Sequence, residues 1–158
     1  LETGRMAISH PPFLLKIEYN MDKTKLKVHV GWSGKNFCCG LSEDIGGAVV
    51  ATAKTLAKLK EDFEESLRWH IGQCLADGDA LPDYIANGNY EIVYELDSAA
   101  MLREAERFTT MATISRVTGI NQKLLSHYAN ALKVPRPAQR QRIVDGLHAI
   151  GRQFLAVQ

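Results

Sequence analysis

Five polar residues in the last third of the chain have side chains of the types that DNA-binding helices use to read base edges. They are Gln122, Lys123, Ser126, His127 and Asn130. On a helix all five point away from the apolar pair Leu125 and Tyr128, so they share one face. A glutamine amide can bond adenine through two atoms, a lysine can reach guanine or a phosphate, and serine, histidine and asparagine can bond either. The pattern predicts a helix that enters the major groove of DNA.

Residues on both sides of this helix favour contact with the phosphate backbone. Thr110 stands at the expected start of the preceding helix, where backbone N–H groups can bind a phosphate. Lys133, Arg136 and Arg140 follow the predicted DNA-reading helix and can neutralise the sugar-phosphate backbone. We predict that these four residues and the five above form one DNA-binding site.

The charge is divided unevenly along the chain. Residues 1–100 hold 10 Lys or Arg against 15 Asp or Glu, whereas residues 101–158 hold 9 against 3. The formal net charge of the whole chain is only +1. The basic C-terminal part suits a polyanion, and the acidic part suits a basic protein or simply solvent.

Two short helices joined by a tight turn are expected to position the predicted site. Thr109 or Thr110 can cap the first helix, and Gly119 can end it with a positive φ. Asn121 can cap the second, over residues 122–131. A helix-turn-helix also needs a small residue where the helices cross and apolar residues that lock them together. The residues for these roles are Ser115, Ile114, Ile120 and Leu125. Further helices are expected over 98–108 and from Pro137 onward.

This segment resembles the lambda-repressor-like (XRE) helix-turn-helix family over about residues 98–156. The resemblance is carried by Asn121-Gln122, by Leu125-Ser126-His127-Tyr128 and by the Pro135 that follows. It implies an all-α DNA-binding module. Ser115 stands where the family usually has Ala, and Ala131 where it usually has Gly. The alternative is a helical hairpin that serves only dimerisation, with its charges in solvent.

The N-terminal part has the pattern of a small α+β module. Strands are expected over 26–32, 36–41, 48–52 and 90–96, because these segments alternate or are β-branched. A helix capped by Thr55 and ending near Gly78 comes before the last of them. The expected order is therefore β-β-β-α-β, with a boundary to the helical part near residue 97.

One face of this helix holds a cluster of acidic residues, namely Glu61, Asp62, Glu64 and Glu65. Such a run is ordinarily a solvated surface, but it can also steer a cationic partner protein. Strand addition at an open sheet edge is an equal possibility, either for dimerisation or for capture of the partner.

The strand order and the Thr55-Leu56-Ala57-Lys58-Leu59 helix start are similar to HicB antitoxins, and the tail is similar to the HicB type that ends in an XRE module. The resemblance implies a partial RNase-H-like module over 21–97 and a DNA-binding module over 98–158. It also implies a type II toxin-antitoxin function. The first module would neutralise a small HicA-like ribonuclease toxin, and the second would repress the shared operon. The Gly-rich loop at 44–47 departs from the Pro-containing loop common in the family.

The alternative function is a stand-alone transcription regulator whose N-terminal module senses a ligand or dimerises. A nuclease is a third possibility, but two-metal catalysis needs carboxylates on neighbouring strands, and the first three predicted strands contain none. His70 and Cys74 are four residues apart, and no second pair of metal ligands completes a site with them. We therefore expect neither enzyme activity, nor a metal site, nor a cofactor.

The remaining expectations concern assembly and location. A single recognition helix buries little surface, so we expect a homodimer or a higher even oligomer on a double-stranded operator. No apolar run reaches the length of a membrane span, so we expect a cytoplasmic protein without membrane contact. The opening Leu1-Glu2-Thr3-Gly4-Arg5 looks like a cloning remnant, and residues 1–20 are interpreted as a leader without functional weight.

Overall fold

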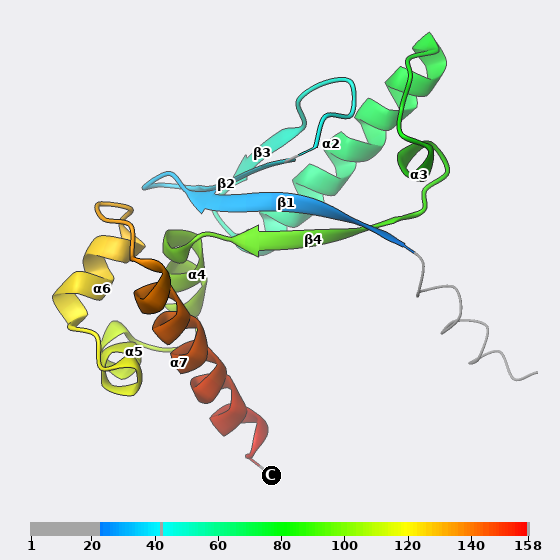
Figure 1. Cartoon of the computed structure of the whole chain (residues 1–158). Coiled ribbons are helices and arrows are strands. Elements are labelled where there is room, and N and C mark those ends of the chain that lie inside the picture. The colour runs from blue at the N-terminus through cyan, green and yellow to red at the C-terminus, as the bar shows by residue number, and fades with distance from the viewer. Residues whose placement is uncertain (1–22, 42, 158) are drawn as a thin grey trace, which may run out of the picture.

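The computed structural model describes residues 23–41 and 43–157 and shows a mixed α+β fold (Figure 1). Its strands are β1 (Thr24–Trp32), β2 (Phe37–Leu41), β3 (Val50–Ala53) and β4 (Tyr90–Leu96). Its helices are α2 (Leu56–Asp77), α3 (Asp83–Ala86), α4 (Ser98–Ala105), α5 (Met111–Thr118), α6 (Gln122–Ala129) and α7 (Pro137–Leu155). The predicted α+β class is confirmed. The predicted leader over residues 1–20 lies outside the described residues.

The four strands form one mixed sheet in the order β3-β2-β1-β4. The β1–β2 and β2–β3 pairs are antiparallel, and β4 runs parallel to β1. Alternate residues of β1 point to opposite faces, as the pleat requires. Leu26, Val28 and Val30 are therefore buried on one face, while Lys27 and His29 are exposed on the other.

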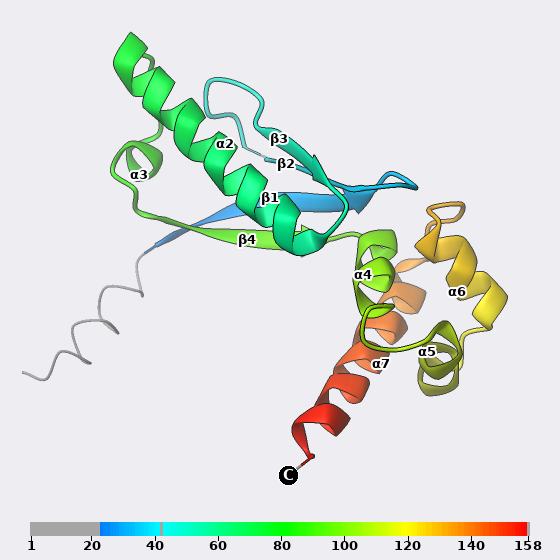
Figure 2. The same ribbon diagram turned by 180° about the vertical axis from the view of Figure 1, so that it is seen from behind.

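Helix α2 covers the apolar face of the sheet (Figure 2). Thr55 caps its first turn by accepting a hydrogen bond from the Lys58 N–H, and Gly78 ends it with a left-handed φ of 76°. Leu59, Phe63 and Leu67 recur every four residues and are buried against the strands. These residues form the side of α2 that packs on the sheet.

Several boundaries differ from the sequence-based expectation. The short helix α3 lies between α2 and β4, where the sequence predicts no helix or strand. The helix expected over 98–108 ends at Ala105, and the one expected over 122–131 ends at Ala129. After Ala105 the chain continues as a turn, in which the Phe108 N–H donates to the carbonyl of Ala105 at 3.0 Å, and such fraying makes helix ends the least sharply defined part of a helix.

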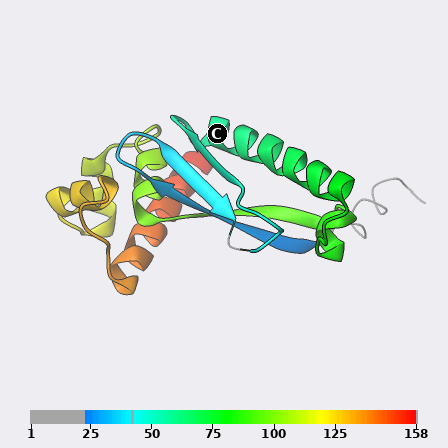
Figure 3. The ribbon, with the colours of Figure 1, turned by 90° about the horizontal axis from the view of Figure 1, so that it is seen from above.

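The C-terminal helices enclose a second core at one end of the sheet. Its buried residues are Leu102, Met111, Ile114, Ile120, Leu125, Tyr128, Ala129, Ile143 and Ile150. Figure 3 shows this group of helices beyond the end of the strands, with α2 lying along the sheet. None of the helices in the described part of the chain is both long and apolar enough to cross a lipid bilayer.

Helix α4 belongs to both cores, because it begins directly after β4. The carboxylate of Asp97 caps it by accepting a hydrogen bond from the Ala100 N–H at 2.7 Å. Ala100 is fully buried in the core of the sheet, and Leu102, half a turn later, is fully buried in the core of the helices. The orientation of the helical part relative to the sheet is therefore fixed by packing as well as by the chain connection.

Candidate nucleic-acid interface

Helices α5 and α6 are joined by a tight turn whose geometry follows from its residues. Thr110 caps α5 through the Thr113 N–H, and Gly119 ends α5 with a left-handed φ of 66°. Asn121 then caps α6 through the Lys123 N–H. The Ser115 hydroxyl donates to the carbonyl of Ile120 at 2.6 Å, so the small residue predicted at the crossing also closes the turn.

Helix α7 supports this pair of helices from behind. A Cβ atom at Gly146 would lie only 2.4 Å from Cγ2 of Thr118, so α7 and α5 approach too closely there for any larger residue. The Arg142 guanidinium donates to the carbonyl of Thr118 at 2.7 Å and so satisfies an acceptor at the end of α5. The position of α7 against the end of α5 is thereby fixed at Thr118.

Helix α6 presents its first turn to solvent. Gln122 and Lys123 are exposed, and Ser126 and His127 are half-buried on the next turn. Leu125 and Tyr128 are buried on the opposite side, as the sequence predicts. Figures 1 and 2 both place α6 at the outer end of the molecule, away from the sheet. The first turn of α6 is thus a short polar surface that no other helix or strand of the described residues covers.

Asn130 differs from the other predicted base-reading residues because its side chain is already engaged. Its amide Nδ2 donates to the carbonyl of Ser126 at 2.8 Å, and its Oδ1 accepts a hydrogen bond from the Arg103 guanidinium. Arg103 also donates from Nε to the carbonyl of Ala129 at 3.0 Å. Asn130 therefore closes the end of α6, and Arg103 is a residue that the sequence-based prediction missed.

The predicted phosphate contacts also separate into two kinds. Thr110, Lys133 and Arg136 are exposed near the ends of α5, α6 and α7. The Arg140 guanidinium instead donates to the carbonyl of Leu96 at 3.0 Å and to the hydroxyl of Ser98 at 3.2 Å. Arg140 thus ties α7 to the end of β4, a contact that the local sequence does not indicate.

Ala131 adopts a left-handed backbone conformation directly after α6, with a φ of 56°. It is the only residue other than glycine with a positive φ in the described part of the chain. The carbonyl of His127 accepts from the Leu132 N–H at 2.9 Å, which completes the end of the helix. The XRE resemblance leads one to expect Gly at this position, and a left-handed φ is the conformation that glycine adopts most readily.

The acidic residues of α2 do not form one open surface. Asp62 pairs with Lys58 at 2.7 Å, and Glu64 accepts a hydrogen bond from the Tyr94 hydroxyl at 3.2 Å. Burial, and then the carboxylate of Glu64, raises the pKa of Tyr94. Glu61 and Glu65 remain exposed. Only part of the predicted acidic cluster is thus available to a partner.

The cysteine and histidine side chains of the N-terminal module make structural contacts. Cys39 is buried in the sheet core, whereas Cys38, on the opposite face of β2, is half-buried. Burial raises the pKa of the Cys39 thiol to about 11. His70 Nε2 donates to the carbonyl of Ile45 at 3.1 Å and lies 3.5 Å from Sγ of Cys74. Within the described residues no group of three or more His, Cys, Asp or Glu side chains is close enough to hold a metal ion.

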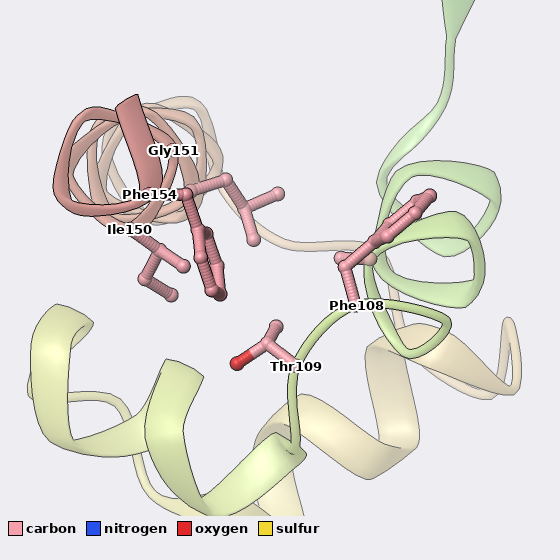
Figure 4. A pocket seen from close by; sticks show the side chains of 7 residues that line it. Phe108, Thr109, Ile150, Gly151 and Phe154 are labelled. Atoms are coloured by element: carbon pink, nitrogen blue, oxygen red, sulfur yellow. The ribbon is translucent and has the colours of Figure 1, made fainter. Parts of the chain in front are cut away.

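An apolar groove of about 460 Å³ lies between the C-terminal half of α7 and the segment that joins α4 to α5. Figure 4 shows Ile150 and Phe154 of α7 facing Phe108 and Thr109 across it. Phe108 and Phe154 are 66% and 60% exposed, although both are large and aromatic. In Figures 1 and 2 this end of α7 is far from α6, so the groove and the polar face of α6 are separate surfaces.

Comparison of the chain with protein-family models, with curated proteins and with solved structures gave no match. The functional argument therefore depends on the residues and on their arrangement.

Proposed function

We propose that the chain is a DNA-binding antitoxin of a HicAB-like type II toxin-antitoxin system. In this proposal the C-terminal helices act as an XRE-like helix-turn-helix that represses an operon. The N-terminal module, a partial RNase-H-like fold, neutralises a small basic ribonuclease toxin in the cytoplasm. The protein acts without enzymatic activity of its own.

The main observation in support of DNA binding is the exposed first turn of α6. Gln122 and Lys123 are exposed to solvent there, on a helix that packs against α4 and α5. Residues at the start of a recognition helix are the ones that reach base edges in the major groove. The surplus of basic over acidic residues after residue 100 adds attraction to phosphates.

Assembly as a homodimer belongs to the same proposal. Two recognition helices can read two half-sites about one DNA turn apart, which a single helix cannot do. The groove around Phe108 and Phe154 supports a dimer, because large exposed apolar patches are typical of protein interfaces. A dimer formed through this groove leaves α6 exposed, so each copy can bind the second copy and DNA at the same time.

The test uses the full chain and the DNA that precedes its own gene. Fluorescence anisotropy should show binding to this DNA about a thousandfold tighter than to scrambled DNA of the same length. The product of the neighbouring open reading frame should copurify with the chain and should be toxic when expressed alone. DNA binding without such a partner would favour a stand-alone regulator instead.

A further inference from the structure

A second groove lies in the N-terminal module, at the edge of the sheet where, among the strands of the described residues, β3 has no neighbour on its outer side. Its volume is about 430 Å³. It is lined by Ala48, Val49, Val50, Glu65, Ser66, Trp69 and His70. One wall is therefore the segment that leads into β3 and ends at its first residue, Val50, and the other is the middle of α2.

Two large apolar side chains at this groove are exposed to an unusual degree. Trp69 is 68% exposed and Val50 is 66% exposed. Tryptophan carries much of the binding energy in protein interfaces, and an open strand edge pairs readily with another chain. The opposite edge strand, β4, has only half-buried side chains, and its Glu95 is paired with Lys27 at 3.0 Å. Of the two edge strands, β3 is therefore the one that lies beside exposed apolar side chains.

The loop that forms this groove is fastened at two points. His70 of α2 donates to the carbonyl of Ile45, and Tyr84 of α3 donates to the carboxylate of Glu43. A Cβ atom at Gly47 would lie 2.8 Å from Cε1 of His70, so the loop is pressed directly onto the helix. The groove therefore exists before any partner arrives, which lowers the entropic cost of binding.

The charge at the groove indicates what kind of chain fits. Glu65 lines the groove and forms no ion pair within the described residues, and the exposed Glu61 lies one helical turn away. Lys58 lies 3.8 Å from the carboxylate of Glu61 but 2.7 Å from that of Asp62, so Asp62 is its closer partner. The groove therefore combines an open backbone edge, an apolar wall and a negative rim, and it is complementary to an extended segment with apolar and basic side chains.

We propose that β3 receives an extended segment of the basic toxin as an additional strand of the sheet. An apolar side chain of that segment packs against Trp69, and a Lys or Arg side chain pairs with Glu65. This inference rests on the proposed antitoxin function and adds the surface through which the toxin is held. It also separates toxin binding from the DNA-reading helix, which lies at the other end of the molecule.

The test measures the affinity of the full-length chain for the purified product of the neighbouring open reading frame. Trp69→Ala should weaken this binding about 30-fold, as the loss of an interface hot spot does. Glu65→Lys should weaken it about tenfold or more. The matched controls are Leu75→Ala, an exposed apolar residue of α2 outside the groove, and Glu61→Lys, one turn from Glu65. Leu75→Ala should leave the affinity within twofold, and Glu61→Lys should slow association without matching the loss at Glu65.

Hydrogen exchange provides the second measurement, because strand addition protects backbone amides. Amides of β3 should exchange more slowly in the complex, and those of β4 should not change. Protection at β4, or an unchanged affinity in Trp69→Ala, would overturn the inference while leaving the antitoxin function standing. If Trp69→Ala abolishes homodimerisation, a second copy of the chain occupies the β3 edge, and the inference is overturned as well. If the wild-type chain does not bind this product, the antitoxin function itself is rejected.

Discussion

Arg103 of α4 places its guanidinium 5.5 Å from the ring centroid of Trp32, at the end of β1. The same guanidinium donates to the carbonyl of Ala129, to Asn130 and to Glu106. One side chain thus joins the sheet to the end of the proposed recognition helix. Its planar group allows this, because its donors lie in the guanidinium plane while the face of that plane stacks on the aromatic ring.

Replacement of Arg103 should therefore affect the fold and DNA binding together. In Arg103→Met the carbonyl of Ala129 loses its donor, and we expect the free energy of unfolding to fall by about 1–3 kcal/mol. Affinity for operator DNA should fall as well, because the end of α6 is no longer held. Urea denaturation and anisotropy measure the two effects. The control is Glu106→Gln, which keeps a hydrogen-bond acceptor beside Arg103; equal losses in both variants would contradict the role of the α6 contacts.

Gln122 and Arg136 should make different contributions to DNA binding. Gln122→Ala removes a base contact and should cost about 1–3 kcal/mol on the operator, with little effect on scrambled DNA. Arg136→Ala should weaken binding to both DNAs and reduce the dependence of log K on log salt concentration by about 1. A salt titration of the affinity separates the two.

Arg140 provides the control for Arg136, because its guanidinium is bound to Leu96 and Ser98. Arg140→Ala should lower the free energy of unfolding and leave the salt dependence near that of the wild type. A reduced salt dependence in this variant would show that Arg140 contacts phosphate as the sequence predicts.

Ala131→Gly should stabilise the protein. Ala131 has a φ of 56°, a region that costs an L-residue with a Cβ about 1 kcal/mol relative to glycine. We expect the free energy of unfolding to rise by roughly that amount in urea denaturation. The opposite control is Ala149→Gly in the interior of α7, which should destabilise by at least about 0.5–1 kcal/mol. A lower free energy of unfolding in Ala131→Gly would show that the backbone at Ala131 is not strained.

The stability should fall in alkaline solution because of Cys39. Burial raises the pKa of its thiol to about 11, whereas an unfolded chain ionises near the ordinary value of 9.0. Above pH 9 the unfolded state therefore loses this proton first, and the free energy of unfolding decreases up to about pH 11. Urea denaturation between pH 8 and pH 11 measures the slope. In Cys39→Ala the slope should be shallower.

Local signals predicted most of the secondary structure correctly. Thr55 and Gly78 delimit α2, and Thr110 and Gly119 delimit α5, because caps and left-handed glycines act within one turn of the chain. Alternation of apolar residues likewise placed Leu26 and Val28 in the core. These features depend only on near neighbours in the sequence.

Features that depend on distant residues could not be predicted in this way. Arg140 was interpreted as a phosphate contact, but its partners on β4 and α4 are more than 40 residues away in the sequence. Trp69 is 68% exposed on α2, which its aromatic side chain does not indicate. Both features depend on how elements that are far apart in the sequence pack together, which no short window of sequence contains.

The dimer proposal predicts the effect of a charge in the groove of α7. Phe154 is 60% exposed in the monomer, so Phe154→Glu should leave the fold intact while placing a carboxylate in an apolar contact. We expect the dissociation constant of the dimer to rise at least about tenfold in sedimentation experiments, since burying an unpaired charge costs several kcal/mol. Leu75→Glu, at an exposed site of α2, should have no such effect. DNA affinity should fall with dimerisation, because two half-sites are then read by separate chains. A wild-type chain that sediments as a monomer, alone and on DNA, would reject the dimer and would leave the groove for another partner.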